Sequence, residues 1–274
     1  MTTGGGDRSC LALRLAGPLQ SWGSESRFNR RDTDVMPTKS GVVGLLAAAE
    51  GRHRGDPILD LVNLRLGVRA DQPGTLLRDY HTVSDYRGLP LLSSASDARG
   101  LQKKTSPTKH TAVTRRYYLQ DAVFVAVVEG DRSLVSGLAE AVRCPAFPLA
   151  LGRRSCVPSQ PLLIRPEGGA DDALWPGDLR ANLSLVPWQA STSHRRKVQR
   201  TSGPIEHVRL AASSDSHDGD DVRTDVPVSF AHRDRAFTMR RVTHTWVEVP
   251  TGFTSDDSAP TSGRNHDPFS LLGW

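Results

Sequence analysis

The chain has 274 residues, 37% of them hydrophobic and 24% charged, with a formal net charge of +5 and a pI near 9.4, so it can form one large or two small domains. No window approaches the roughly 18 uninterrupted apolar residues of a membrane helix, and the polar start MTTGGGDRSC lacks the apolar core of a secretory signal. These features predict a cytoplasmic protein that does not enter a membrane.

The first predicted element is a strand over residues 10–16, where leucines alternate with other residues before a Gly-Pro break. A polar, arginine-rich loop follows. Thr38 or Ser40 can then cap a helix whose apolar run spans residues 42–49.

A second, shorter helix is predicted over residues 58–63 with Asp56 as its cap, and LRLGVRA, residues 64–70, returns as a strand. Residues 76–118 are rich in Ser, Thr, Gly and basic side chains and show little apolar periodicity. Such a segment cannot lie in a core, so we interpret it as an excursion from the body, either a long hairpin or a flexible arm.

The segment 118–129, YLQDAVFVAVVE, is almost continuously apolar and β-branched, which predicts one central strand. Asp131 or Ser133 can cap the following helix, SLVSGLAEAVR. The order strand, helix, strand, excursion, strand, helix is that of a split βαβ, ferredoxin-like unit. We therefore predict an α+β fold in which residues 1–150 form a ferredoxin-like domain, and one face of such a sheet often binds single-stranded RNA.

Residues 151–250 are predicted to form a smaller β-rich region, in which VPVSF and MRRVTHTWVEV are strands. We interpret residues 165–178 and 213–221 as linkers or loops. The second of these, SSDSHDGDD, lacks the spacing of an EF-hand, which favours a solvated acidic loop over a metal site. The low-complexity tail, residues 251–274, is predicted to be mobile.

Cys10, Cys144 and Cys156 are odd in number and far apart, and no CxxC pair is present. Buried reduced thiols are the expected state, rather than disulfides or a zinc site. The sequence predicts neither a metal nor a cofactor.

Basic residues are clustered in five runs. Residues 99–118 contain six bases and no acid. The other runs are RFNRR at 27–31, GRR at 152–154, HRRKVQR at 194–200 and HRDRAFTMRR at 232–241. A solvated face explains any single run, whereas five runs in one chain favour a nucleic-acid track.

The stretch VMPTKSGVVGLL, residues 35–46, places its glycines after Lys39 and Ser40, whereas a nucleotide-binding loop places them before this pair. This reversed order disfavours an NTPase. The helix start still offers free N–H groups, the charge of Lys39 and the hydroxyls of Thr38 and Ser40 to a backbone phosphate of RNA.

No GxSxG or HExxH motif is present. Lys109-His110, with Tyr80, Tyr117 and Tyr118 nearby in sequence, is the cluster that could cleave RNA by metal-free acid–base chemistry. The alternative is that the pair is a basic RNA contact on a mobile arm.

Several motifs occur in order: LRLAGPLQSWG at 13–23, PTKSG at 37–41, LRDYHTV at 77–83, DYRGL at 85–89, RYYLQDAVF at 116–124 and LGRRSC at 151–156. Together they resemble the CasD subunit family of the type I-E CRISPR surveillance complex, Cascade, a branch of the RAMP superfamily. The match is dense over residues 11–158 and reappears weakly at 227–242.

The resemblance implies a non-catalytic scaffold with an RRM-like body and a protruding thumb hairpin at about residues 79–117. Such a subunit grips the 5′ handle of the guide RNA and joins the backbone subunit to the large PAM-reading subunit in antiviral defence, meeting target DNA only indirectly. The RNA-binding residues expected on this basis are Gln20, Ser21, Trp22, Arg27, Arg31, Thr38, Lys39, Ser40, His81, Lys109, Arg115, Arg116, Arg153 and Arg154. Trp22 is either a stacking platform for a base or a core tryptophan.

Two other functions stay open. In a related CRISPR subtype the equivalent subunit trims repeat RNA with a Tyr–Lys–His type of site, which would give Lys109 and His110 catalytic roles. The DYHTV and LGRRSC motifs resemble instead the type I-E branch, in which a separate subunit, CasE, cuts. The third function is a protein-only interaction module, which would lack the steep salt dependence that phosphate contacts produce.

Overall fold

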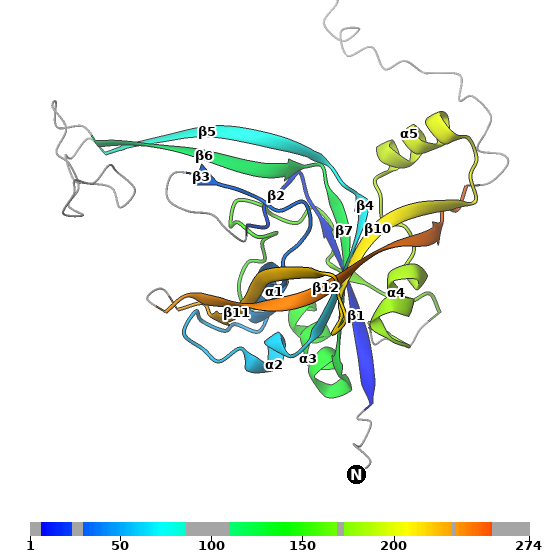
Figure 1. The fold of residues 1–274 in the computed structure, drawn as a ribbon, viewed down its shortest axis with the longest axis horizontal. Helices are drawn as coiled ribbons and strands as arrows, with labels where there is room; N and C mark the ends of the chain where they lie inside the picture. Colours follow the sequence, from blue (N-terminus) through cyan, green and yellow to red (C-terminus); the bar gives the residue numbers. More distant parts are fainter. Residues whose placement is uncertain (1–6, 24–29, 86–109, 169–172, 232–233, 254–274) are drawn as a thin grey trace, which may run out of the picture.

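The computed structural model describes residues 7–23, 30–85, 110–168, 173–231 and 234–253. Together the helices and strands of these residues make a mixed α+β fold (Figure 1). In chain order they are β1 (Arg8–Ala16), β2 (Leu19–Gln20), β3 (Arg30–Arg31), α1 (Lys39–Ala49), α2 (Leu59–Val62), β4 (Arg65–Gln72), β5 (Thr75–Asp85), β6 (His110–Gln120), β7 (Val123–Asp131), α3 (Arg132–Arg143), β8 (Leu163–Ile164), β9 (Leu174–Trp175), α4 (Leu179–Leu185), α5 (Thr192–Ser202), β10 (His207–Asp215), β11 (Asp221–Ser229) and β12 (Ala236–Pro250).

A large antiparallel sheet organises the body. Its strand order in the described residues is β11-β12-β10-β4-β7-β1-β8, and β9 also pairs with β1. Strand β1 is buried on both faces: Leu11, Leu13 and Leu15 pack with α1 and α3, while Cys10 and Ala12 pack with α4. This double burial explains why the strand contains so few polar residues.

The element order predicted for the first half of the chain is present. β1, α1, β4, β7 and α3 follow one another with the β5–β6 pair inserted, and β4, β7 and β1 are neighbours in the sheet. Thr38 caps α1 by accepting from the Gly41 N–H at 3.2 Å, and Asp131 caps α3. The prediction of an α+β fold is therefore confirmed.

Two local predictions were wrong. The apolar run 118–129 is not one strand. β6 ends at Gln120, the chain turns at Asp121, whose φ is +57°, and β7 then starts in the large sheet. The sequence does not reveal this corner, because the residue that follows it, Ala122, is apolar and buried like the residues of the strands. Asp56 does not cap α2; its carboxylate accepts from the His53 N–H at 2.7 Å.

The C-terminal half adds strands to the same sheet. β10 pairs with β4 and β12, and β12 pairs with β11, so residues 213–215 and 221 are strand rather than loop. The helices α4 and α5 had no counterpart in the prediction. A domain boundary at residue 150 is not tested by these contacts, and the predicted mobile tail after residue 253 lies outside the described residues.

The predicted excursion contains a two-stranded ribbon. β5 and β6 pair antiparallel from Thr75↔Gln120 to Asp85↔His110, and the ribbon extends away from the body in Figure 1. β2 pairs with β6 at its base and β3 pairs with the middle of β6, so these strands and β5 form a second, four-stranded sheet. The segment between β5 and β6, residues 86–109, lies outside the described part of the chain.

No helix among the described residues has both the length and the apolar character needed to cross a membrane.

Arg69 on β4 fastens α4 to the sheet. Its guanidinium is completely buried, bonds both oxygens of Asp71 at 2.6 and 2.8 Å, and donates to the carbonyls of Leu183, Val186 and Pro187. All of these acceptors lie in or just after α4, apart from Asp71. A buried cation on a central strand is thus neutralised and fully hydrogen-bonded.

We expect Arg69→Met to lower the free energy of unfolding by about 3–5 kcal/mol, because it leaves the buried Asp71 carboxylate unpaired. Urea unfolding at neutral pH measures this change. Arg180→Met, an exposed arginine on α4, is the matched control and should change it by no more than about 0.5 kcal/mol. Equal effects of the two changes would contradict the role given to Arg69.

Candidate nucleic-acid interface

The outer surface of the ribbon combines cations with rings. Residues opposite each other across an antiparallel pair lie on the same face, and alternate residues share that face. The register pairs Arg78 with Tyr117 and Tyr80 with Arg115. We call this surface the tyrosine face; its described members that are not buried are Leu76, Arg78, Tyr80, Thr82, Val113, Arg115 and Tyr117, while Leu119 is buried at the base.

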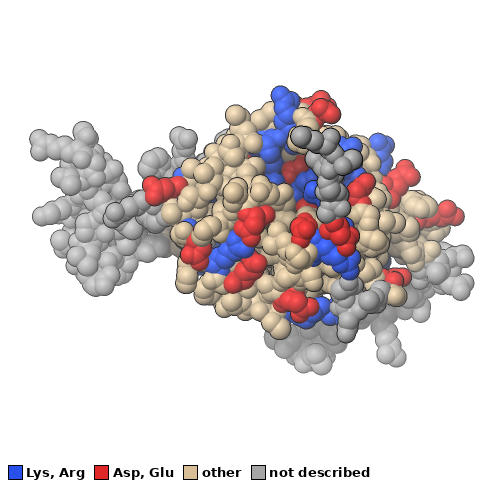
Figure 2. All heavy atoms as spheres, turned by 90° about the horizontal axis from the view of Figure 1, so that it is seen from below, with Lys and Arg blue, Asp and Glu red and all other residues tan. Residues whose placement is uncertain are grey.

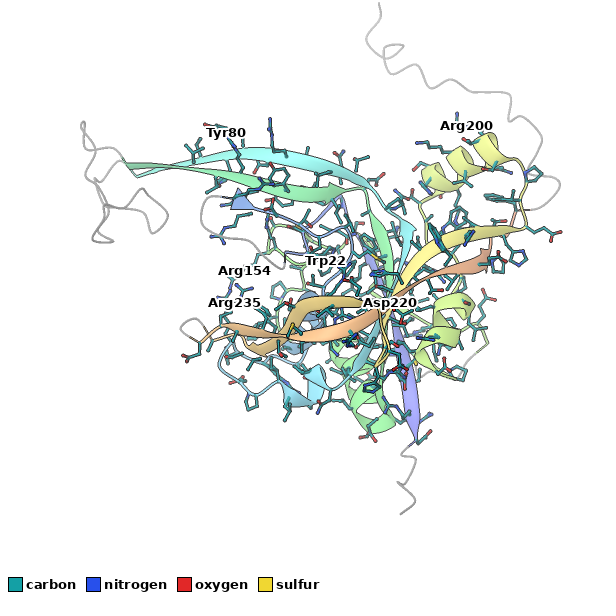
Figure 3. The ribbon with its side chains drawn as sticks, viewed as in Figure 1. Trp22, Tyr80, Arg154, Arg200, Asp220 and Arg235 are labelled. Atoms are coloured by element: carbon teal, nitrogen blue, oxygen red, sulfur yellow. The ribbon has the colours of Figure 1, made fainter. Side chains whose placement is uncertain are left out.

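Tyr80 is the most accessible ring of this face. It is 65% exposed and stands on β5 well away from the body (Figure 3). Arg78 and Arg115 beside it are exposed as well. None of the seven members named above is acidic, so the exposed ring of Tyr80 and the exposed guanidinium groups of Arg78 and Arg115 lie together, which suits base stacking with phosphate binding.

β3 adds a further arginine to this surface. It pairs in parallel with β6, placing Arg30 opposite Arg115. The Arg30 guanidinium lies 5.3 Å from the centre of the Tyr117 ring and bonds Asp32 at 2.9 Å. These contacts hold the Tyr117 ring in one orientation.

The opposite face of the ribbon is electrically mixed. Asp79 lies opposite Arg116, and the Nδ1 atom of His81 lies 3.8 Å from the Asp79 carboxylate. Arg31 pairs with Arg116 on this side. The structure therefore divides the predicted RNA contacts of the ribbon, with Arg115 on the tyrosine face and Arg31, His81 and Arg116 on the opposite face.

The two arginines of the GRR loop have different positions. Arg153 donates to the carbonyls of Arg31 at 2.6 Å and of Tyr117 at 3.2 Å, and stacks on the Tyr118 ring at 4.8 Å. It thus fastens β3 to β6. Arg154 is exposed (Figure 3).

The Gln20-Ser21-Trp22 segment is buried. Gln20 donates to the carbonyls of Leu15 at 2.8 Å and Ala122 at 2.7 Å, and accepts from the Trp22 indole at 3.0 Å. The Trp22 ring is 1% exposed, so the structure supports the core-tryptophan alternative and corrects the stacking one. A Cβ on Gly41 would lie 2.6 Å from this ring, which explains the glycine at that position.

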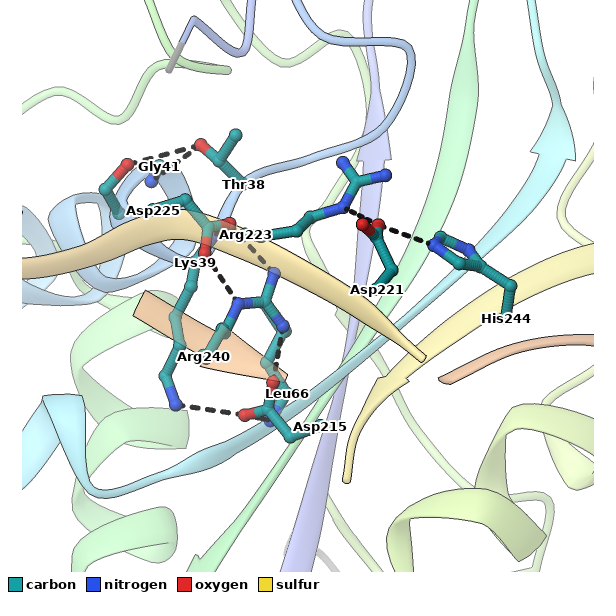
Figure 4. A network of polar contacts seen from close by, with 11 residues as sticks. Thr38, Lys39, Gly41, Leu66, Asp215, Asp221, Arg223, Asp225, Arg240 and His244 are labelled. Atoms are coloured by element: carbon teal, nitrogen blue, oxygen red, sulfur yellow. Dashed lines mark hydrogen bonds and ion pairs between the residues drawn. The ribbon is translucent and has the colours of Figure 1, made fainter. Parts of the chain in front are cut away.

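The predicted phosphate seat at the start of α1 is filled by the chain itself (Figure 4). The Lys39 N–H donates to Asp225 at 2.8 Å, and the Lys39 ammonium bonds Asp215 at 2.9 Å. Arg240 binds both oxygens of Asp225 at 2.6 and 2.8 Å and also bonds Asp215. The anion at this helix start is therefore a carboxylate of β11.

Several residues predicted to bind RNA therefore make contacts within the protein instead. Thr38 is 3% exposed and caps the helix, Lys39 is 8% exposed, and the Ser40 hydroxyl lies 3.3 Å from that of Thr38. Arg27 and Lys109 lie outside the described residues, and of His110 only the backbone is described. Arg30 and Arg78 are the interface residues that were missed, because only the strand register shows that they share a face with Tyr80.

The lower side of the body, shown in Figure 2, does not resemble the tyrosine face. Seen from below, acidic and basic side chains are interspersed over the body (Figure 2). One acid of the predicted acidic loop, Asp221, already has two partners: it bonds His244 at 3.0 Å and Arg223 at 3.0 Å. The acidic loop predicted around residues 213–221 therefore contributes ion pairs within the chain.

Fold and surface together define a mixed α+β protein with a projecting ribbon that presents arginine and tyrosine on one face. Residues 10–243 match the model of a family described as CRISPR-associated protein (Cas_Cas5). The chain belongs to this Cas5 family of CRISPR-associated proteins.

Individual relatives agree with that membership. The chain is 37% identical over 171 residues to "CRISPR system Cascade subunit CasD" of Escherichia coli (strain K12), covering 57% of this chain and 70% of the relative. A chain of a solved "CRISPR RNA-guided surveillance complex" matches with a TM-score of 0.66 and 33% identity, covering 88% of this chain and 91% of that chain. A "Crystal structure of Cas protein" matches with a TM-score of 0.57 and 33% identity over 86% and 94% of the two chains. The resemblance to the CasD family is thus confirmed.

The Asp225 network predicts how stability depends on pH. Burial alone would raise the pKa of Asp225, but the hydrogen bonds and charge of Arg240 and the Lys39 N–H lower it below the usual value. A depressed pKa contributes stability above the unfolded pKa of about 4, and this is lost as pH falls through the folded pKa. We expect Asp225→Asn to destabilise by about 3–5 kcal/mol at neutral pH and to flatten the loss of stability below about pH 5.

Thermal and urea unfolding from pH 7 to pH 2.5 test this expectation. Asp220→Asn, an exposed aspartate at the start of the same hairpin, is the control and should leave the pH profile unchanged. A profile for Asp225→Asn as steep as that of the parent protein would contradict it.

Proposed function

We propose that this chain is a non-catalytic, RNA-binding subunit of a type I-E Cascade in the cytoplasm, with the role that the name of its Escherichia coli relative describes. In that role it grips the 5′ handle of the guide RNA and joins the backbone subunit to the large PAM-reading subunit. The family membership and the relatives support the assembly.

The single observation that carries RNA binding is the tyrosine face. Tyr80 is 65% exposed between Arg78 and Arg115, and none of the seven members of that face is acidic; Asp32 lies at its edge, paired with Arg30. Single-stranded RNA presents bases for stacking and phosphates for bidentate arginine contacts, and this face offers both kinds of partner. Duplex RNA hides its bases, so the exposed rings favour a single strand.

The body supports the proposed arrangement. Its β1-α1-β4-β7-α3 order, with β8 and β9 beside β1, is compatible with a ferredoxin-like, RRM-like unit, and we assign the β5–β6 ribbon as the thumb. The hydrogen bonds of Arg153 hold β3 against β6. The backbone that carries the arginines of the ribbon therefore has a fixed position.

We expect Tyr80→Leu to weaken binding of single-stranded repeat RNA by roughly tenfold, because stacking on one aromatic ring contributes about 1–3 kcal/mol per base. Arg115→Ala should weaken binding and reduce the slope of log affinity against log salt by about 0.7, the value for one lost phosphate contact on a single strand. Fluorescence anisotropy with labelled RNA at several salt concentrations measures both effects.

Two controls separate these effects from general ones. Tyr80→Phe should bind as the parent protein does, and Arg54→Ala removes an exposed arginine remote from the ribbon. Parental binding by Tyr80→Leu would rule out stacking at this position.

The nuclease alternative has a geometric difficulty. His110 pairs with Asp85, whereas Tyr80 pairs with Arg115, five positions further along the ribbon. At about 3.4 Å per residue these pairs are roughly 17 Å apart, too far for Tyr80 or Tyr117 to join His110 in one site. We therefore expect end-labelled repeat RNA incubated with the purified protein in EDTA to stay intact. Cleavage that disappears in His110→Ala would instead establish a metal-independent nuclease.

A further inference from the structure

Helix α5 carries a stripe of exposed basic side chains that do not contribute to the packing of the helix on the body. Its sequence, TSHRRKVQRTS, contains four basic residues besides His194 and no acid. None of its side chains is fully buried. One of the four, Arg195, contributes to the fold, and the other three, Arg196, Lys197 and Arg200, are exposed.

One side of α5 is anchored to the body. Arg195 donates to the carbonyls of Trp188 and Ala190 and lies 5.0 Å over the Trp188 ring. His194 contacts the same ring at 6.1 Å, and Val198 packs in the cluster around it. At the start of the helix, Ser191 bonds the buried Gln72 at 2.8 Å. The helix is therefore held in a fixed orientation.

The opposite side is the cationic one. With 100° between successive residues, Ser193, Arg196, Lys197 and Arg200 fall within one arc, away from Val198. None of the three cations forms an ion pair or hydrogen bond with another described residue. Like charges three or four residues apart destabilise a helix, so this arrangement does not serve the stability of α5.

The chemistry of this stripe differs from that of the tyrosine face. It has phosphate-binding cations and a hydroxyl but no aromatic ring, since His194 points toward Trp188. Without a ring, a surface can hold a phosphate backbone but cannot stack on a base. Neighbouring cations on one helix face, about 5–6 Å apart, can contact successive phosphates of one strand.

We propose that the Arg196, Lys197 and Arg200 stripe of α5 binds the phosphate backbone of duplex nucleic acid without sequence preference. This contact is separate from the single-stranded RNA site. α5 and the far end of the β5–β6 ribbon lie at opposite sides of the molecule, and Arg200 lies on the outer end of α5 (Figures 1 and 3). One chain can thus hold a single strand at the ribbon and a duplex at α5.

The test uses the full chain, a 20-base-pair DNA duplex of arbitrary sequence and the single-stranded repeat RNA. Arg196→Ala/Arg200→Ala should weaken duplex binding by about tenfold or more at 0.1 M salt and reduce the salt slope by about two, one for each lost phosphate contact. Its binding of single-stranded RNA should match that of the parent. Arg196→Lys/Arg200→Lys should keep most duplex affinity, because the charge is retained.

Arg54→Ala/Arg180→Ala is the matched control, since it removes two exposed arginines outside α5 and changes the net charge equally. It should bind the duplex as the parent does, and thermal melting shows that all variants are folded. Parental duplex binding by the α5 variant, or an equal loss in the control, would overturn the proposal. Loss of binding to poly-L-glutamate with duplex binding intact would also overturn it and assign α5 to an acidic protein surface. Loss of single-stranded RNA binding by the α5 variant with duplex binding intact would likewise overturn it, because the stripe would then belong to the RNA site. Parental RNA binding by Tyr80→Leu, in contrast, would count against the tyrosine face and not against α5.

Discussion

The buried Gln20 side chain joins the two sheets of the molecule. It is completely shielded from solvent. Its amide nitrogen donates to the carbonyl of Leu15 near the end of β1 and to the carbonyl of Ala122 just before β7, and its amide oxygen accepts from the indole of Trp22. A buried amide is stable only when its donors and acceptor are satisfied. The bonds to Leu15 and Ala122 therefore help to fix the position of the ribbon relative to the body.

A continuous set of contacts leads from this side chain to both ends of the site. The Trp22 ring packs against Gly41 in α1, and the start of α1 is held by Asp225, Asp215 and Arg240 from the C-terminal strands. In the other direction, Gly152 approaches the Ser21 carbonyl so closely that a Cβ there would lie 1.8 Å away, and the next residue, Arg153, fastens β3 to β6. The C-terminal strands thus support the base of the ribbon although they lie far from it in sequence.

Local patterns predicted the elements well and the contacts poorly. Alternation, caps and β-branched runs identified β1, α1, β4, β7 and α3, because each is set by residues close in sequence. The corner at Asp121 was missed because Gln120 and Asp121 interrupt the apolar run for only two residues, and α5 was missed because it has no apolar stripe. Lys39 and Trp22 were assigned to RNA because their partners, Asp225 and the buried Gln20, could not be inferred from spacing alone. A cation and a helix start do form an anion site, but the anion comes from the chain.

The five basic runs show why net charge is a weak guide to binding. Arg240 from the last run bonds carboxylates within the protein. Arg153 from the GRR loop bonds backbone carbonyls and stacks on a tyrosine ring. What distinguishes the candidate interfaces is a local shortage of acid: no named member of the tyrosine face or of the outer stripe of α5 is acidic, although Asp32 pairs with Arg30 at the edge of the tyrosine face. Aromatic content then separates the two, because a ring beside the cations selects unstacked bases while cations alone select the backbone. The specificity of each surface therefore follows from what accompanies its arginines rather than from their number.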